Sequence, residues 1–402
     1  MRLLLPSAFI LLTWLPISAA AQQWVLVGGD FQGHPITLLG LDRQGVRVAG
    51  GQTVGWDQVL ELDYTGVTSA AATDAFTLRL NGGDSLSGTP LSIASDTIVW
   101  RQSALGRLEI PEDRAAAIVR AGSAITGVDQ PRREDLVKLV NGDSTSGVVQ
   151  GMSGGRVSIT PAGANSAARI DLDKIAAVLL ADPDPLAPPS PGPAGAWRVW
   201  LNDGSSLTVS FLQMDTGTPD RLHFGFGDTA AAGVDVSAVT CIERLNGPVR
   251  WLTDLTPVSA VYRPFLSENF PPRFDHPVDD PQATIRARFP PFRHGIGVHS
   301  YTKLTYAVPA GFATFRTQFA IERIAGSDET RADVAVRIAV DGKVVQEFPH
   351  VRFGPPADPV TVDVNGAREL SLEVDYGPNL AAEGRFLWLD PAFVRSVPRE
   401  DK

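Results

Sequence analysis

The stretch "GIGVHSYTKLTY", residues 295–306, gathers side chains that could act on a small molecule or bind one. His299 precedes Ser300, and an imidazole can serve as the base that activates a serine hydroxyl. A triad also needs a third group that orients the base, and the sequence offers no motif that supplies one. A neutral imidazole can instead hydrogen-bond sugar hydroxyls, or it can fix a turn by bonding backbone carbonyls. The binding and turn-fixing roles of His299 both stay open, and catalysis is the least supported.

Three further residues complete the candidate binding set. Trp388 and Asp390 lie in "LWLDP", where the indole could stack on the apolar side of a pyranose or fill the core. Asp390 precedes a proline and is equally typical of a turn. Tyr301 and Tyr306 differ by an odd number, so on one strand they would point to opposite faces, and at most one can face a groove. We therefore predict a carbohydrate site that contains His299, Tyr301, Trp388 and Asp390.

Motifs of established enzyme classes are missing from the sequence. It contains no G-x-S-x-G elbow, no H-E-x-x-H, no P-loop and no cysteine nucleophile motif. Glycoside hydrolysis needs two carboxylates that flank a bond, and none of the 45 acidic residues stands in a distinctive frame. We therefore expect that the protein has no catalytic residues and is not an enzyme. The alternative that it is a glycoside hydrolase stays open.

A metal site is also not predicted. "DHPVDDP" brings together Asp275, His276, Asp279 and Asp280, and oxygen-rich loops can hold calcium, but the prolines favour plain turns. Cys241 is the only cysteine, so it can form neither an intrachain disulfide nor a thiolate cluster. We read it as a small buried hydrophobe in the strand "VTCIERL". No cofactor is expected.

Charge and the first residues restrict partners and location. The net charge of −10 argues against nucleic acid, which requires a concentrated basic face. Residues 1–21 read as a secretory signal with a cleavage site after Ala21. Its apolar run is shorter than the roughly 20 residues that span a bilayer. We expect a soluble protein, secreted or periplasmic, without a membrane span after cleavage.

The elements that must position these residues are strands. From residue 250 to 396, period-two alternation and a VDGK hairpin predict an antiparallel two-sheet sandwich of jelly-roll kind. The proline-rich segment 263–281 carries Phe265, Phe270 and Phe274 and is predicted to be an ordered arm on this domain. The fold class is all-β. Residues 397–402 are a tail.

The N-terminal part shows a recurring pattern of strand, Gly/Asn/Asp turn and strand, which predicts four small β units. The turn aspartates are Asp30, Asp84, Asp143 and Asp203, and "IPEDRAAAIVRA" could form a short helix. The pattern resembles Sm-like or SH3-like small barrels. The predicted boundaries are 22–68, 69–126, 127–181 and 197–249 for the units, with a proline-rich linker at 182–196.

The C-terminal third resembles a known family. "WLTDLTPVSAVY", "GIGVHSYTKLTYAVP", "FRTQFAIE", "VRIAVDGKVV", "VDVNGARELSLEVDYG" and "WLDPAF" occur in the order typical of the NPCBM domain. The resemblance implies a β-sandwich related to carbohydrate-binding modules of exported bacterial proteins, and hence a glycan or polysaccharide as partner. Glu322 and Arg323 stand where the family commonly has aspartates.

Together these patterns favour an exported, non-catalytic carbohydrate-binding protein, in which the N-terminal units are a scaffold or a protein-contact surface. The alternative is a structural protein that binds cell-envelope proteins and no sugar.

Overall fold

The computed structural model describes residues 24–66, 75–123, 125, 132–181, 195–214, 221–225, 232–264, 270–278, 292–322, 330–380 and 382–395. Their regular elements are β-strands and short 3-10 helices, which confirms the all-β class. None of the helices in these ranges is long and apolar enough to cross a membrane. The predicted signal segment and residues 182–194 of the predicted linker lie outside the described residues.

Four segments make up the N-terminal part, and in each the last strand pairs with the first, β1 with β6, β7 with β11, β12 with β16, and β17 with β22. The first segment contains β1 (Trp24–Gly28), β2 (Gly33–Ile36), β3 (Leu38–Leu41), β4 (Gly45–Val48), β5 (Gln52–Gly55) and β6 (Val59–Tyr64). The second contains β7 (Phe76–Leu80), β8 (Ser85–Ala94), β9 (Thr97–Gln102), β10 (Gly106–Pro111), η2 (Glu112–Arg114) and β11 (Ala115–Arg120).

The third and fourth segments also have a 3-10 turn before the last strand, with five strands in the third and six in the fourth. The third contains β12 (Asp135–Leu139), β13 (Ser144–Ser153), β14 (Arg156–Pro161), β15 (Ala168–Asp171), η3 (Leu172–Lys174) and β16 (Ile175–Leu179). The fourth contains β17 (Trp197–Leu201), β18 (Ser206–Val209), β19 (Leu212–Met214), β20 (Arg221–Phe224), β21 (Ala232–Asp235), η4 (Val236–Ala238) and β22 (Val239–Arg244). Common descent of the four segments from one unit stays a prediction.

Two details of the sequence interpretation are wrong. The alternative of a short helix at "IPEDRAAAIVRA" is wrong: Glu112–Arg114 is a 3-10 turn, and the alanines that follow form β11, because β7 and β16 flank them with backbone partners. In the fourth segment the position that matches Asp84 is Ser205 and not Asp203. Leu80 N donates to Asp84 O over 2.9 Å, and Leu201 N donates to Ser205 O over 2.8 Å.

The segments associate through their last strands. β11 pairs with β16, which joins the second and third segments, and β22 pairs with β6, which joins the fourth and first. A contact between β8 and β18 links the two pairs, where Thr208 N donates to Asp84 Oδ2 and Ser87 N donates to Ser205 Oγ. One continuous hydrophobic core therefore runs through all four segments.

The C-terminal part is a sandwich of two antiparallel sheets. Its elements are β23 (Val249–Trp251), η5 (Leu252–Asp254), β24 (Ser259–Tyr262), β25 (Arg273–Phe274), β26 (Gly295–His299), β27 (Thr302–Ala307), β28 (Phe312–Ile321), β29 (Asp333–Val340), β30 (Lys343–Arg352), β31 (Val360–Asp363), β32 (Glu369–Tyr376) and β33 (Arg385–Arg395). One sheet has the order β25-β26-β33-β28-β31, with β23 also paired to β33, and the other has the order β24-β27-β32-β29-β30. A separate core fills the space between them.

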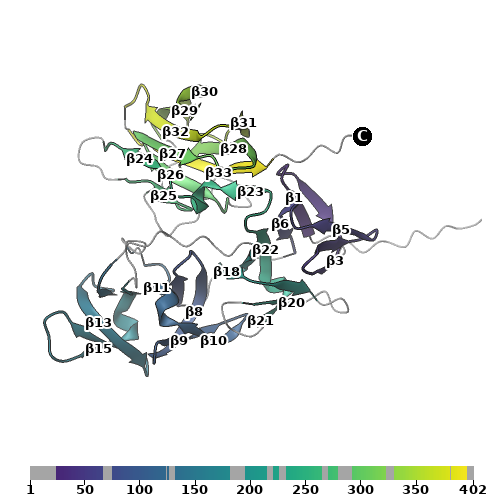
Figure 1. Ribbon diagram of the computed structural model, residues 1–402. Helices are drawn as coiled ribbons and strands as arrows, with labels where there is room; N and C mark the ends of the chain where they lie inside the picture. The colour runs from purple at the N-terminus through teal and green to yellow at the C-terminus, as the bar shows by residue number, and fades with distance from the viewer. Residues whose placement is uncertain are drawn as a thin grey trace, which may run out of the picture.

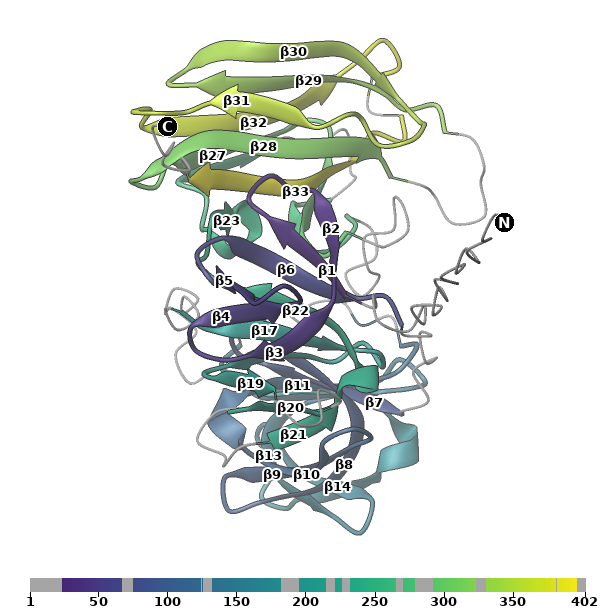
Figure 2. The ribbon, with the colours of Figure 1, turned by 90° about the vertical axis from the view of Figure 1, so that its right-hand side faces the viewer.

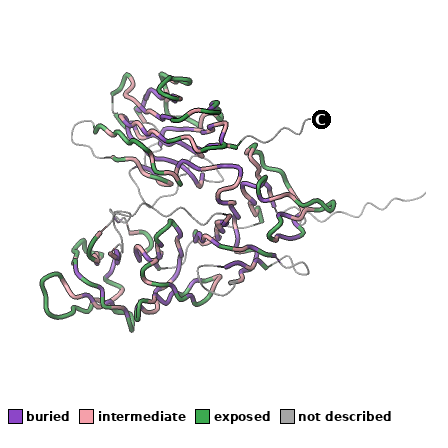
Figure 3. The backbone as a smooth tube through the Cα atoms, viewed as in Figure 1, coloured by how far each residue is buried: buried purple, intermediate pink, exposed green. Residues whose placement is uncertain are grey.

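Figures 1 and 2 show the sandwich stacked on the first and fourth segments, with the second and third segments at the far end of the molecule. Figure 3 shows buried stretches in the inner strands of the sandwich and exposed stretches at its periphery. β26 is buried along its whole length, whereas β30 at the edge of its sheet is largely exposed.

A buried carboxylate joins the sandwich to the fourth segment. Glu243 of β22 accepts hydrogen bonds from Trp251 Nε1 at 2.7 Å and from His294 Nε2 at 2.9 Å. The indole and imidazole rings are stacked, with centroids 4.2 Å apart. Burial alone would raise the pKa of Glu243, but the charge of His294 and its hydrogen bond lower it to about 2. Burial opposes the charged form of His294, yet the Glu243 carboxylate raises the pKa of His294 well above its usual range.

The residue before His294 extends the junction to the first segment. Arg293 contacts Asp63 at 2.9 Å and Glu61 at 3.3 Å, both on β6. Burial raises the pKa of Glu61 to about 7, although the Arg293 charge acts in the opposite direction. The dipeptide Arg293–His294 thus connects the sandwich to two N-terminal strands that themselves pair with each other.

Gly147 lies where β13 and β14 approach each other closely. It lies inside β13 with φ +157°, and a Cβ there would overlap the Thr160 carbonyl oxygen and lie 2.8 Å from Pro161 Cα. We predict that Gly147→Ala lowers the free energy of unfolding by roughly 2–4 kcal/mol, measured by urea denaturation. The control is Gly354→Ala, where a Cβ meets nothing within 4 Å. Equal stability of the two variants would contradict the requirement for glycine at position 147.

The His294–Glu243 pair predicts a dependence on pH. Between pH 7.5 and 8.5 an unfolded histidine is neutral, whereas His294 in the folded protein keeps its proton because its pKa is raised. The folded state therefore binds the extra proton, and stability falls as pH rises, by up to about 1.4 kcal/mol per pH unit. Glu61, with a pKa of about 7, has largely ionised below this window.

His294→Gln should remove this slope, measured as the free energy of urea unfolding at the two pH values. His350→Gln is the matched control, because His350 also contacts a carboxylate, that of Asp333 at 3.2 Å, but its side chain is 55% exposed. Equal slopes for wild type and His294→Gln would show that His294 is not held protonated in the folded protein.

Candidate functional site

His299 ends β26, and its side chain is on the face of the strand opposite to the core residues Ile296 and Val298. Its side chain is buried, its Nδ1 lies 2.8 Å from the Ser300 carbonyl oxygen, and its ring stacks on Phe270 with centroids 5.2 Å apart. The Ser300 hydroxyl is also buried and has no hydrogen-bond partner within the described residues, so it does not form a nucleophile and base pair with His299. Contact of His299 with a sugar stays a prediction that requires Phe270 to move.

Gly297 in the same strand explains part of the glycine pattern. A Cβ at this position would lie 2.5 Å from His276 O and 2.7 Å from Val278 N. The absence of a side chain at Gly297 therefore makes room for the backbone of residues 276–278, and it does not make room for a ligand.

Trp388 lies in the core between the two sheets. Its relative exposure is 1%, and it packs edge-on against Phe319 and Phe386, with centroids 6.0 and 5.0 Å away. The indole face is covered by protein in this conformation. A role of Trp388 in stacking on a sugar stays a prediction, and its position matches the alternative of a core residue.

Asp390 lies at the opposite end of β26 from His299. Its backbone N donates to His294 O at 3.0 Å, and its φ of +46° marks an irregularity in the pairing of β33 with β28. Because Gly295 pairs with Leu389 and His299 pairs with Arg385, the strand register separates Asp390 from His299. The four predicted residues therefore do not line one surface.

Tyr301 is the member of the set with a partly exposed aromatic ring. Its ring centroid lies 6.5 Å from that of Tyr376, and the Arg263 guanidinium stands over the Tyr301 ring at 5.3 Å. Burial and the nearby charge of Glu373 raise the pKa of Tyr301. Tyr306, by contrast, is fully buried in the core, so one of the two tyrosines faces outward.

Tyr376 and Glu373 were not predicted as site residues from the sequence. The alternation in "ELSLEVDYG" does indicate that the Glu373 side chain faces outward, because Leu370, Leu372 and Val374 point inward. The pairing of Tyr376 with Tyr301 depends on the path of the loops, which no periodicity reveals.

A possible metal-ligand set occurs at the junction. Three residues, Glu61, Asp63 and Cys241, each offer one ligand atom, and these three atoms lie within 4.8 Å of one another. Arg293 contacts both carboxylates, so a guanidinium already supplies the positive charge there. Burial raises the pKa of the Cys241 thiol well above its usual value, which disfavours a thiolate ligand. In the segment considered for calcium, Asp275 accepts a hydrogen bond from Gly295 N, while Asp279 and Asp280 lie outside the described residues.

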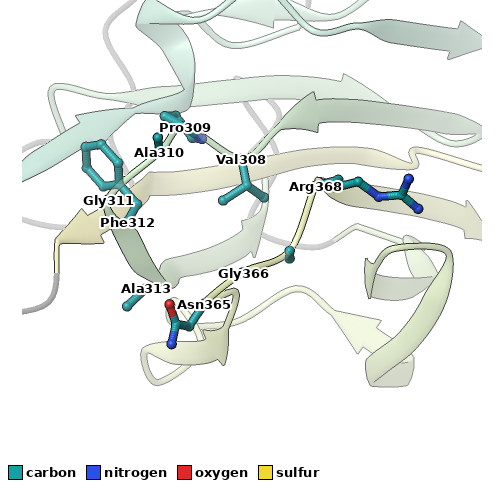
Figure 4. Close-up of a pocket in the computed structure, with 10 residues that line it drawn as sticks. Val308, Pro309, Ala310, Gly311, Phe312, Ala313, Asn365, Gly366 and Arg368 are labelled. Atoms are coloured by element: carbon teal, nitrogen blue, oxygen red, sulfur yellow. The ribbon is translucent and has the colours of Figure 1, made fainter.

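A cavity of about 560 Å³ opens between two loops of the sandwich (Figure 4). Residues 308–313 and 365–368 line it, and its side-chain polar groups are those of Asn365 and Arg368. Phe312, the aromatic residue of the lining, is only 6% exposed. The cavity therefore has a suitable size for a ligand but offers neither an acid–base pair nor an open aromatic face.

Comparisons with known proteins give a match for part of the chain. No curated protein matches. Among solved structures, the CBM51-2 and INT domains of Clostridium perfringens ZmpB share 22% identity over 46% of this chain and 37% of that chain, with a TM-score of 0.32. The present chain therefore covers just over a third of that structure.

Two other solved structures are similar at lower identity. The CBM51 of a Clostridium perfringens GH95 protein, in complex with methyl-galactose, shares 18% identity over 36% of this chain and 99% of that chain, with a TM-score of 0.31. The tandem CBM51 modules of a Streptococcus pneumoniae family 98 glycoside hydrolase share 12% over 92% and 88%, with a TM-score of 0.32. Residues 249–394 match the model of the NPCBM/NEW2 domain, which confirms the resemblance of the C-terminal third to that family.

Proposed function

We propose that this protein is an exported, non-catalytic carbohydrate-binding protein whose C-terminal sandwich recognises a glycan. The observation that carries the proposal is the match of residues 249–394 to the NPCBM/NEW2 domain, a resemblance that implies sugar binding. The partly exposed Tyr301 and its neighbour Tyr376 support it, since tyrosine combines an apolar ring with a hydroxyl that can meet sugar hydroxyls.

The N-terminal segments are proposed to act as a scaffold. Their shared core and their strand pairing make one extended support, and the Glu243 junction holds the sandwich on it. Cell-envelope proteins are proposed as a second class of partner for this scaffold. A secreted or periplasmic location belongs to the same proposal.

Absence of catalysis is part of the proposal. Glu61, the carboxylic acid whose pKa is raised to about 7, could serve as an acid at neutral pH on that ground alone. It is held in a largely buried ion pair with Arg293 between the sandwich and the first segment, where a substrate has no access.

Binding should be tested with the intact mature chain, because Trp251 and His294 of the sandwich depend on Glu243 of the fourth segment. We predict that the immobilised protein retains one or more members of a broad polysaccharide and glycan panel and releases no reducing sugar from them. Retention of none would contradict sugar binding. Reducing-sugar release that is lost on changing one acidic residue would contradict the non-catalytic role.

Core burial predicts how two substitutions of Trp388 behave. Trp388→Ala should lower the free energy of unfolding by about 3–5 kcal/mol, as for other buried tryptophans, because it leaves a cavity beside Phe319 and Phe386. Trp388→Phe should cost less and keep glycan retention, measured on the same panel. A stably folded Trp388→Phe variant that loses retention would instead support direct stacking of the indole on sugar.

A further inference from the structure

The outer face of the sheet β24-β27-β32-β29-β30 carries a row of charged side chains that crosses four strands. Lys303 pairs in register with Glu373, Glu373 with Arg337, and Arg337 with Glu347. The ion-pair distances along the row are 3.5 Å, 2.8 Å and 2.9 Å. Asp375 joins it through Arg337 Nη1 at 3.0 Å.

Tyr301 connects this row to the tyrosine pair. Its hydroxyl is near Glu373, and burial together with the Glu373 charge raises the pKa of Tyr301, while its ring lies against Tyr376 and under Arg263. The Tyr376 hydroxyl donates to Arg263 O at 3.1 Å. Tyr376 is the last residue of β32 and pairs with the core residue Val334, so its side chain leaves the strand on the side opposite to Glu373, and its ring meets that of Tyr301 at the end of the sheet. The row of hydrogen-bonding groups therefore carries the Tyr301 ring, with the Tyr376 ring at its rim. We call these residues, Arg263, Tyr301, Lys303, Arg337, Glu347, Glu373, Asp375 and Tyr376, the tyrosine face.

The groups of the tyrosine face are held in place before any ligand arrives. Glu373 is only 17% exposed and contacts Lys303 and Arg337. Small residues lie beside Arg337 on the same side of the sheet, since Ala335 and Ala339 are two positions away in β29. Fixed polar groups lose little conformational freedom on binding, which is the general condition for useful affinity from a shallow surface.

The charges of the tyrosine face balance, and this decides the class of ligand. Arg263, Lys303 and Arg337 carry three positive charges, and Glu347, Glu373 and Asp375 carry three negative charges. An acidic glycan would need an excess of cations, as would any phosphate-bearing ligand. Carboxylates and guanidinium groups that are already paired can still accept from and donate to uncharged hydroxyls.

We propose that the tyrosine face is the glycan-binding site of this protein and that it takes an uncharged glycan, with pyranose rings against Tyr301 and Tyr376 and hydroxyls on Glu373 and its neighbours. This inference rests on the proposed function. It assigns the site to the face of a sheet, away from the cavity at 308–313 and 365–368. Strands β29, β30 and β32 lie on the side of the sandwich away from the N-terminal segments (Figures 1 and 2), so a long glycan could pass over this face.

The test uses the intact protein and two sets of probes. Uncharged probes are galactose-, glucose- and N-acetylglucosamine-terminated oligosaccharides, and charged probes are polygalacturonate and chondroitin sulfate. Titration calorimetry of wild type should show binding of an uncharged probe with a Kd that changes less than twofold between 50 and 500 mM NaCl, because no net charge is screened.

Tyr301→Ala and Tyr376→Ala should each raise that Kd at least tenfold. Glu373→Gln keeps the shape of the side chain and guards against a simple failure to fold, and it should raise the Kd at least threefold. Phe274→Ala is the matched control, since Phe274 is a 37% exposed aromatic on the other sheet and should leave the Kd unchanged. Thermal unfolding midpoints identify any variant that has lost its fold.

The outcomes separate the two proposals. Wild-type binding that all three folded tyrosine-face variants retain would overturn the site while leaving sugar binding intact. Salt-sensitive binding of the charged probes alone would overturn the uncharged class. If wild type binds neither probe set and no member of the broad panel, this result would contradict sugar binding itself, and the tyrosine face with it.

Discussion

A single buried carboxylate fixes how the two parts of this protein meet. Glu243 projects from the last strand of the fourth segment and accepts from Trp251 and His294, which lie 43 residues apart in the sandwich. A buried carboxylate without such donors would cost several kcal/mol of desolvation, so the pair and the stacked rings form together or not at all. Arg293 adds the first segment to the same contact, and thereby ties the junction to the strand pair β6 and β22.

The junction also determines where the sandwich presents its partly exposed groups. β26 begins next to His294 and ends at His299, so this one short strand runs from the contact with the scaffold towards Tyr301. Its residues are buried along the whole strand, and Gly297 lets the backbone of 276–278 approach it. The first part of the stretch that suggested chemistry, β26, is thus a structural connection, and the tyrosine face begins within the second part, at Tyr301.

Patterns of period two and turn residues predicted the fold class and the sandwich, because burial of one sheet face imposes alternation directly on the sequence. The same rule applied to Tyr301 and Tyr306, of which only Tyr301 is exposed. The alternative of a short helix at 110–121 was wrong, because tertiary strand pairing outweighs the intrinsic helical preference of three alanines. His294, Glu243 and Tyr376 could not be identified, since their partners lie far away in sequence and only the assembled fold brings them together.

The most direct measurement is a crystal structure of the intact protein soaked with the uncharged oligosaccharide that binds best. We expect sugar density against Tyr301 and Tyr376, with hydroxyls within hydrogen-bond distance of Glu373 and with the Glu243 junction unchanged. Density in the cavity between residues 308–313 and 365–368, or against a displaced Phe270 at His299, with none on the tyrosine face, would contradict the assignment.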